Sequence, residues 1–395
     1  MSFSSMPCGR RVVREQDVAT AVASDKANFL RLMPMSPGRI TENFLGLQVT
    51  LCRIVRSRAG KFMRNPRMIR IMLLLAAFAV AAVLAGARPA PAGPHGPADE
   101  DDRRYAGRGI HMMMDGDLDG AIEVFQQIEQ KDPDSPLGYV LEANATWWKI
   151  YYYSANLIDP DVFDVAKMEA TPYDSHFEDL DRVAMQKAEV RIRAHQDVAR
   201  SLLYEGFAYA LRARLDGLHD RDLPTARAGK KMRTLLLEAL RHDPSLTDAY
   251  LGVGIYNYFV DTLPGIVKFL SIFIGLPGGS RTEGLRQLQL CAEKGELGGP
   301  EARFYLAKDF SRGSERQYEK SLRLFSELQE EFPHNSLWPM LVGSLHCRLG
   351  NFQKGEEIYR EVYQRTAGKN SEVDQAVHKA ARQALQRLHP EQNFQ

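Results

Sequence analysis

Two similar stretches, DGDLDGAIEVFQQIEQKDP at residues 115–133 and RQYEKSLRLFSELQEEFP at residues 316–333, decide the fold. In each, a small residue is followed by Phe four positions later, by an aliphatic residue three positions after that, and by Pro after five more. These intervals place the side chains on one helix face, and the proline ends the helix because it has no backbone N–H. Because the pattern recurs within one chain, the sequence predicts an all-α protein built of repeats.

Further copies of the pattern extend the array. The stretch KKMRTLLLEALRHDP at residues 230–244 keeps the last two intervals, and GFAYALRARL at residues 206–215 is a weaker copy. Gly355, Tyr359 and Val362 follow 34 residues after their counterparts in the second stretch. We therefore expect repeats of about 34 residues along most of the chain.

These motifs resemble the tetratricopeptide repeat, a 34-residue helix-turn-helix unit with a small residue where its helices cross and a proline closing the second helix. The resemblance covers most of residues 101–365, although the opening tryptophan of the repeat is replaced by Tyr105 or Tyr250. It implies a helical-hairpin solenoid over residues 101–389, of the kind found in exported bacterial proteins, whose concave side binds a protein or peptide.

Small residues mark the expected helix crossings. Two helices approach closely only where side chains are small, while larger apolar residues fill the interface with the next pair. Gly109, Ala121 and Gly254 occupy the small positions. Since glycine costs about 1 kcal/mol in a helix relative to alanine, its recurrence there indicates a steric need.

Two inserts interrupt the array, near residues 154–200 and 260–282. The first holds an acidic loop and the start of a helix expected from Glu178 to Leu215. The second resembles a segment of tetratricopeptide-39-like proteins and of a mitochondrial outer-membrane inclusion-clearance family, and its stretch at residues 263–276 is nearly uncharged. It predicts either a core helix or a helix that binds a membrane or a partner through Ile266, Phe269, Leu270, Ile272 and Phe273.

An apolar stretch, IMLLLAAFAVAAVLAGA at residues 71–87, follows three arginines and precedes a Pro/Gly/Ala-rich segment. This order is typical of a secretory signal, so we expect residues 63–92 to be a cleaved signal peptide or a single transmembrane anchor and residues 93–100 to be a linker. The body would then be exported, either periplasmic or anchored in the inner membrane outside the cytoplasm. Residues 1–62 are interpreted as an artefact of start-site choice, with translation from Met63 or Met68, or as a basic cytoplasmic tail.

The charge distribution argues against nucleic acid as a partner. Of the 51 basic and 50 acidic residues, residues 1–100 hold 14 and 6, so the remainder holds 37 and 44 and has a net charge of −7. An acidic body lacks the clustered cations that a phosphate backbone requires.

The sequence lacks the common signatures of catalytic and metal-binding sites. The sequence contains no HExxH, GxSxG or CxxC motif, and its ten histidines are scattered. Cys291 and Cys347 are the only cysteines of the body and are interpreted as core thiols, with a bridge between them as the alternative. We therefore expect no enzyme, no cofactor and no metal.

Function is expected to be non-catalytic protein binding by an interaction scaffold or adaptor, with peripheral membrane association through residues 263–276 as the alternative. In tetratricopeptide proteins the first helix of each repeat faces the groove. The resemblance thus assigns partner binding to Asp248, Leu251, Ile255, Tyr258, Leu337, Met340 and Ser344. The aromatic cluster at residues 147–153 is expected to be buried between helices rather than to line the groove.

Overall fold

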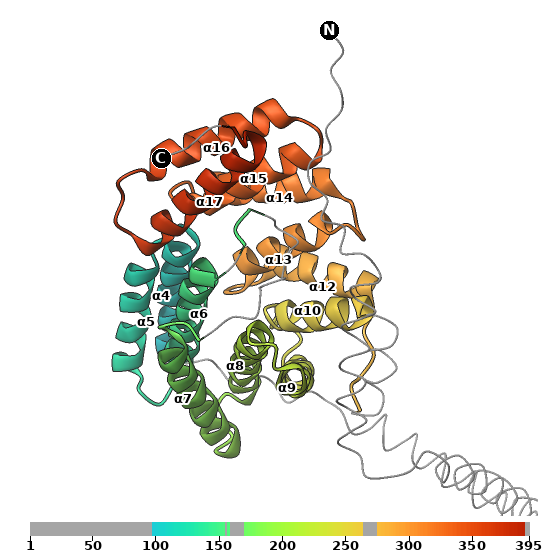
Figure 1. Ribbon diagram of the computed structural model, residues 1–395. Helices are drawn as coiled ribbons and strands as arrows, with labels where there is room; N and C mark the ends of the chain where they lie inside the picture. The colour runs from blue at the N-terminus through green and yellow to red at the C-terminus, as the bar shows by residue number, and fades with distance from the viewer. Residues whose placement is uncertain (1–96, 155, 159–169, 264–274, 392–395) are drawn as a thin grey trace, which may run out of the picture. The chain divides into compact units, whose positions relative to one another are not determined.

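The computed structural model describes residues 97–391 apart from 155, 159–169 and 264–274 (Figure 1). The described residues form thirteen α-helices and no strand. The helices are α4 Pro97–Met114, α5 Leu118–Lys131, α6 Leu137–Ser154, α7 Asp174–Arg193, α8 Val198–Leu218, α9 Asp222–His242, α10 Ala249–Thr262, α12 Arg281–Lys294, α13 Gly299–Ser311, α14 Tyr318–Glu331, α15 Leu337–Arg348, α16 Phe352–Thr366 and α17 Glu372–Leu388. The predicted all-α class is confirmed.

Consecutive helices pack in series as antiparallel pairs, from α4 with α5 to α15 with α16, and α17 follows as a last single helix. The second helices α5, α9 and α14 end two residues before Pro133, Pro244 and Pro333, as predicted. Each has one buried stripe, which in α14 consists of Ser321, Phe325 and Leu328. The arrangement is therefore consistent with a helical repeat array.

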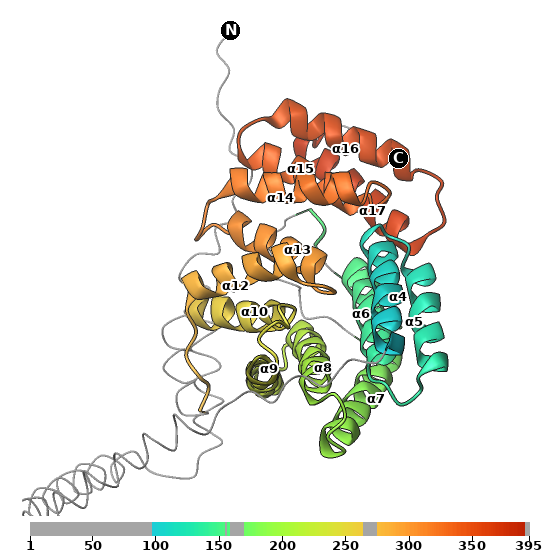
Figure 2. The ribbon, with the colours of Figure 1, turned by 180° about the vertical axis from the view of Figure 1, so that it is seen from behind.

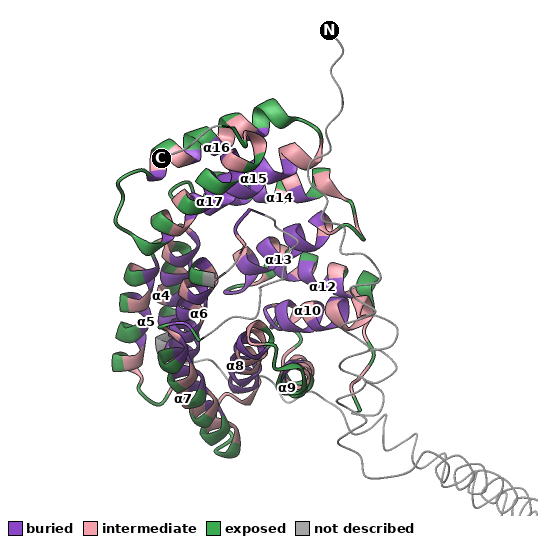
Figure 3. Cartoon of the chain, in the orientation of Figure 1, coloured by how far each residue is buried: buried purple, intermediate pink, exposed green. Residues whose placement is uncertain are grey.

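Apart from α4, the first helices of the pairs are buried on most of their surface. In Figure 3, α10 and α13 are largely purple, whereas α5 and α16 are green on their outward sides. This division follows from composition, because the first helices are apolar on several faces and the second helices are amphipathic. The hydrophobic core consequently extends along the row of first helices.

Glycine allows α10 and α12 to touch backbone to backbone. A Cβ atom added to Gly254 would lie 3.0 Å from the carbonyl oxygen of Gly284 and 2.9 Å from Cγ of Leu288. Similarly, a Cβ atom on Gly109 of α4 would lie 2.4 Å from the ring of Phe125. Ala121 and Phe125 are fully buried, so the residues predicted to mark helix crossings do so.

The prediction of a single helix from Glu178 to Leu215 is wrong. The chain turns between α7 and α8, and His195 and Asp197 adopt left-handed backbone conformations with φ of 56° and 38°. The turn at residues 194–197 contains neither glycine nor proline, and helical periodicity continues on both sides of it. Packing of α7 against α8 therefore compensates the local strain of the turn.

The last helices pack against the first. Figures 1 and 2 show α17 next to α6, and the two helices contact each other. Asn335, just before α15, donates from its amide to the carbonyl oxygen of Met114 at 2.8 Å. Its side-chain oxygen accepts from the hydroxyl of Tyr152 at 3.0 Å. The two ends of the helical series are thus joined by buried polar contacts.

Several sequence predictions fall outside the described residues. They concern the export segment at residues 63–92, the basic stretch at residues 1–62 and the apolar candidate residues Ile266, Phe269, Leu270, Ile272 and Phe273. Among the described helices, none combines the length and the apolar character needed to cross a membrane.

Candidate partner-binding groove

The residues assigned to a concave binding face lie mainly in the interior. Asp248, Leu251, Tyr258, Leu337, Met340 and Ser344 are buried, and only Ile255 is partly exposed. Buried side chains offer no surface to a partner in this structure, so partner contact by these residues stays a prediction. The groove described below uses none of them.

Asp248 illustrates the structural role of these positions. One carboxylate oxygen accepts hydrogen bonds from the backbone N–H groups of Leu297 at 3.0 Å and Gly298 at 2.8 Å. Burial raises the pKa of the Asp248 carboxyl, and the two N–H donors act in the opposite direction. The side chain therefore fixes the loop between α12 and α13.

Aromatic rings fill the space between the inward faces of the first helices. Trp148 of α6 lies 5.1 Å from Phe304 of α13 and 6.2 Å from Trp338 of α15, measured between ring centroids. Phe304 and Trp338 are themselves 5.8 Å apart. Tyr151 joins the group at 5.9 Å from Phe304. The expected burial of the aromatic cluster is confirmed for Trp147, Trp148 and Tyr152, whereas Tyr153 is 61% exposed.

Charged groups among these rings are paired. Glu301 of α13 accepts from Arg214 of α8 at 2.5 Å and from Asn144 of α6 at 3.0 Å. The guanidinium of Arg214 also lies 4.9 Å from the ring centre of Tyr305. Burial raises the pKa of Tyr305 to about 12. Because Glu301 accepts from α6 and from α8, these contacts fix the packing of α6, α8 and α13.

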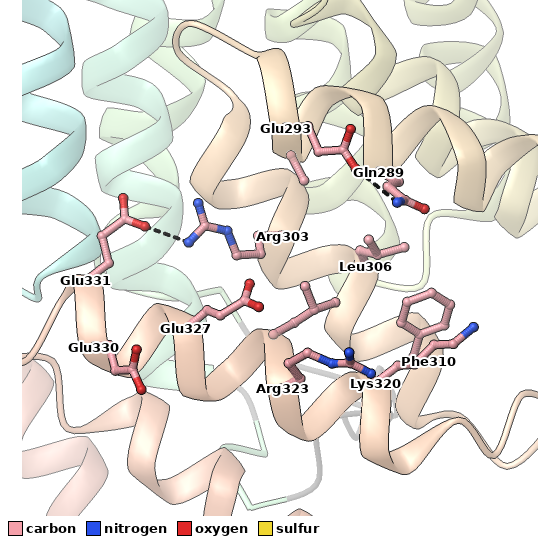
Figure 4. A pocket seen from close by; sticks show the side chains of 12 residues that line it. Gln289, Glu293, Arg303, Leu306, Phe310, Lys320, Arg323, Glu327, Glu330 and Glu331 are labelled. Carbon is pink, nitrogen blue, oxygen red and sulfur yellow. Dashed lines mark hydrogen bonds and ion pairs between the residues drawn. The ribbon is translucent and has the colours of Figure 1, made fainter.

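An open groove of ≈ 840 Å³ lies on the other side of α13, between α12 and α14 (Figure 4). Arg303, Leu306 and Phe310 recur at helical spacing and face the groove, whereas Phe304 and Glu301 point to the interior. Phe310 and Leu324 of α14 are partly exposed and form an apolar floor, and Leu306 is buried beneath it. The groove is thus lined by the faces of three successive helices.

The rim of the groove carries opposite charges at its two ends. Lys320 and Arg323 lie in the first half of α14, and Glu327, Glu330 and Glu331 lie in its last turns (Figure 4). Eleven residues separate Lys320 from Glu331, which is roughly 16 Å along a helix. The groove therefore has a basic end and an acidic end.

Two interactions hold the rim in place. Arg303 of α13 donates to Glu331 of α14 at 2.5 Å, and Gln289 donates to Glu293 within α12 at 2.9 Å (Figure 4). The ammonium group of Lys320 lies 5.3 Å from the ring centre of Phe310, so its alkyl chain follows the apolar floor. Arg323, Glu327 and Glu330 are exposed, and no ion pair joins them to another described residue.

Three carboxyls outside the groove have strongly raised pKa values. Burial raises the pKa of Asp181 and of Asp309 to about 7, and burial with an adjacent Glu142 raises that of Glu129 to about 8. Within the described part of the chain, no three His, Cys, Asp or Glu side chains are arranged to hold a metal ion. Cys291 is buried and Cys347 is partly exposed, and no disulfide joins the two.

Comparison with known proteins adds no relative. No family model matches the sequence, and no curated protein matches it significantly. Sequence analysis also missed the groove residues, although Lys320, Arg323, Glu327 and Glu331 recur at intervals of three or four. Such a stripe is indistinguishable in sequence from an ordinary solvated helix face.

Proposed function

We propose that this chain is a non-catalytic binding protein of helical-repeat architecture, which holds a polypeptide segment of a partner protein in the groove formed by α12, α13 and α14. The observation that supports this proposal is the partly exposed apolar floor of Phe310 and Leu324 beneath a rim with a basic and an acidic end. A floor of this kind takes apolar side chains of a partner, and the charged rim sets its direction.

The charges define the occupant. A matching segment carries acidic side chains where it passes Lys320 and Arg323, apolar side chains over Phe310, and basic side chains beside Glu327 and Glu330. An amphipathic helix of about three turns has the required length, because the charged ends are roughly 16 Å apart. The same reasoning disfavours nucleic acid, since it has no positive end.

The proposal also includes a repeat type and a cellular location. The 34-residue spacing and the small crossing residues support a tetratricopeptide-like array. The apolar stretch at residues 71–87 supports export of the array to the periplasm or to the outer face of the inner membrane. Under this proposal the protein acts as an adaptor outside the cytoplasm.

Charge reversal tests the proposal. The double variant Lys320→Glu, Arg323→Glu should lose a partner that co-purifies with the unaltered chain from solubilised cells, as quantified by mass spectrometry. A peptide from that partner should bind the unaltered chain and bind the variant at least about tenfold more weakly.

The matched control is Arg227→Glu, Lys230→Glu on α9. These residues are exposed, have the same spacing and the same charge, and lie outside the groove. Equal binding of the partner peptide to both double variants would refute the groove as the binding site.

A further inference from the structure

A second concave surface lies between the end of α16 and α17, and its lining has a different character. It is a pocket of ≈ 450 Å³ lined by Thr366, Gly368, Lys369, Gln375, His378, Lys379 and Arg382. No lining residue is a carboxylate, and four of the seven are basic. This composition contrasts with the mixed charges of the groove formed by α12, α13 and α14.

The basic stripe follows from the periodicity of α17. Val373, Val377, Ala381 and Leu385 face the core, so the opposite face of the helix presents Gln375, His378, Lys379 and Arg382 at intervals of three, four and seven residues. Lys379 and Arg382 are exposed and lie about one turn apart. Among the described residues, neither has an ion-pair partner. Two like charges at this spacing repel each other unless an anion lies between them.

His378 is held rigidly at the pocket wall. Its ring stacks on Tyr363, with ring centroids 4.3 Å apart and planes inclined by 19°. Nδ1 lies 3.1 Å from the carbonyl oxygen of Tyr363 and 3.0 Å from the hydroxyl of Thr366. Since a carbonyl oxygen only accepts, this contact assigns the proton to Nδ1 and leaves Nε2 on the opposite edge of the ring.

The basic residues of the pocket lie near the C-terminal, partially negative end of α16, but interaction with that helix end does not explain all of them. His378 fulfils that role through its contact with the carbonyl of Tyr363. Lys369 is partly neutralised by Asp374, whose carboxylate lies 3.3 Å away. Lys379 and Arg382 have neither a carbonyl nor a carboxylate partner among the described residues. Their charges are therefore available to a ligand.

We infer that this pocket binds a small ligand with two adjacent oxyanion groups, either phosphates or carboxylates, through Lys379 and Arg382. Arginine and lysine are the side chains that most often bind such groups, and charge-assisted hydrogen bonds are about twice as strong as neutral ones. A single oxyanion would fill only a small part of ≈ 450 Å³, which favours a ligand with two. Gln375 and Thr366 add polar contacts at the pocket wall.

Isothermal titration calorimetry on the full-length chain tests this inference, with sodium diphosphate and citrate as separate probes at constant ionic strength. We expect one binding site for at least one of the probes, and the better probe identifies phosphate or carboxylate as the preferred group. Lys379→Gln, Arg382→Gln should weaken binding at least about tenfold.

The control variant Arg227→Gln, Lys230→Gln removes the same charge at the same spacing on α9, and it should bind within about twofold of the unaltered chain. Absence of binding to both probes would overturn the inference, as would an equal loss in the two double variants. Circular dichroism checks that both variants are folded. The outcome is independent of the groove, because the two sites share no residue.

Discussion

Trp338 donates its indole N–H to the carbonyl oxygen of Met114 at 3.2 Å, although 224 residues separate them. The same carbonyl accepts from Asn335 at 2.8 Å. In an open helical array each repeat contacts only its neighbours, and stability is nearly a sum over adjacent pairs. Here α15 also contacts the first helix α4, and α17 contacts α6, so we expect the ends to contribute to one cooperative unit.

Removing the contact between the ends should destabilise the whole domain. Asn335→Ala leaves the Tyr152 hydroxyl without its acceptor and removes one donor from Met114, which costs about 1–3 kcal/mol of unfolding free energy. Urea unfolding followed by circular dichroism measures the change. His334→Ala is the control. It removes a contact with Asp115 across the same ends, but the His334 side chain is 83% exposed, so the value should change by less than about 1 kcal/mol. Equal values for the two variants would contradict the role of Asn335.

Glycine substitutions should have opposite effects at two helical positions. Gly254→Ala forces apart α10 and α12 and should cost about 1–3 kcal/mol, and Gly254→Leu more. Gly107→Ala in α4 meets no atom within 4 Å and should stabilise the protein by up to about 1 kcal/mol. Thermal unfolding of both variants checks this pair. A rise in melting temperature for Gly254→Ala would show that the helix crossing tolerates a side chain.

The buried carboxyl of Asp181 should make stability depend on pH. Both carboxylate oxygens lack a hydrogen bond, and the nearest cation is Arg212, with Nε 3.6 Å away. Burial raises the pKa of Asp181 from 3.8 to about 7. A raised carboxyl pKa means that the folded state binds more protons than the unfolded state between these values. The contribution of Asp181 to stability is therefore fully present below pH 4 and is lost as the pH rises through 7.

Asp181→Asn removes this pH dependence. The variant should be more stable than the unaltered protein by at least about 1 kcal/mol at pH 8, and the difference should disappear near pH 4. Urea unfolding at both pH values measures it. Asp179→Asn, at an exposed position two residues earlier, should behave like the unaltered protein. A difference that does not change with pH would show that Asp181 does not titrate in this range.

Local features of the fold could be predicted from the sequence because they depend on neighbouring residues. Pro133 and Pro333 each end the preceding helix through the local chemistry of proline, which does not depend on the tertiary structure. The four-residue spacing from Ala121 to Phe125 places both side chains on one face of any regular helix. The break at Asp197 depends instead on how α7 packs against α8, and no glycine or proline marks it.

The candidate site could not be located in the same way. The first helices α10 and α15 are apolar on several faces, so sequence alone could not distinguish a face that lines a groove from one that packs on another helix. Contacts such as Trp148 with Phe304 bring together residues that are distant in sequence. These contacts fill the expected concave face and leave the opposite side of α13 as the open surface.

The most direct test of the account is photo-crosslinking in living cells with p-benzoylphenylalanine placed, one position at a time, at Glu327 on the groove rim, at Ile255 on the expected concave face and at Val190 on α7. Glu327 is exposed, and Val190 is 56% exposed. The account predicts a protein adduct from position 327 alone, which disappears in the Lys320→Glu, Arg323→Glu background. An adduct from position 255 without one from position 327 would contradict it, as would the absence of any adduct.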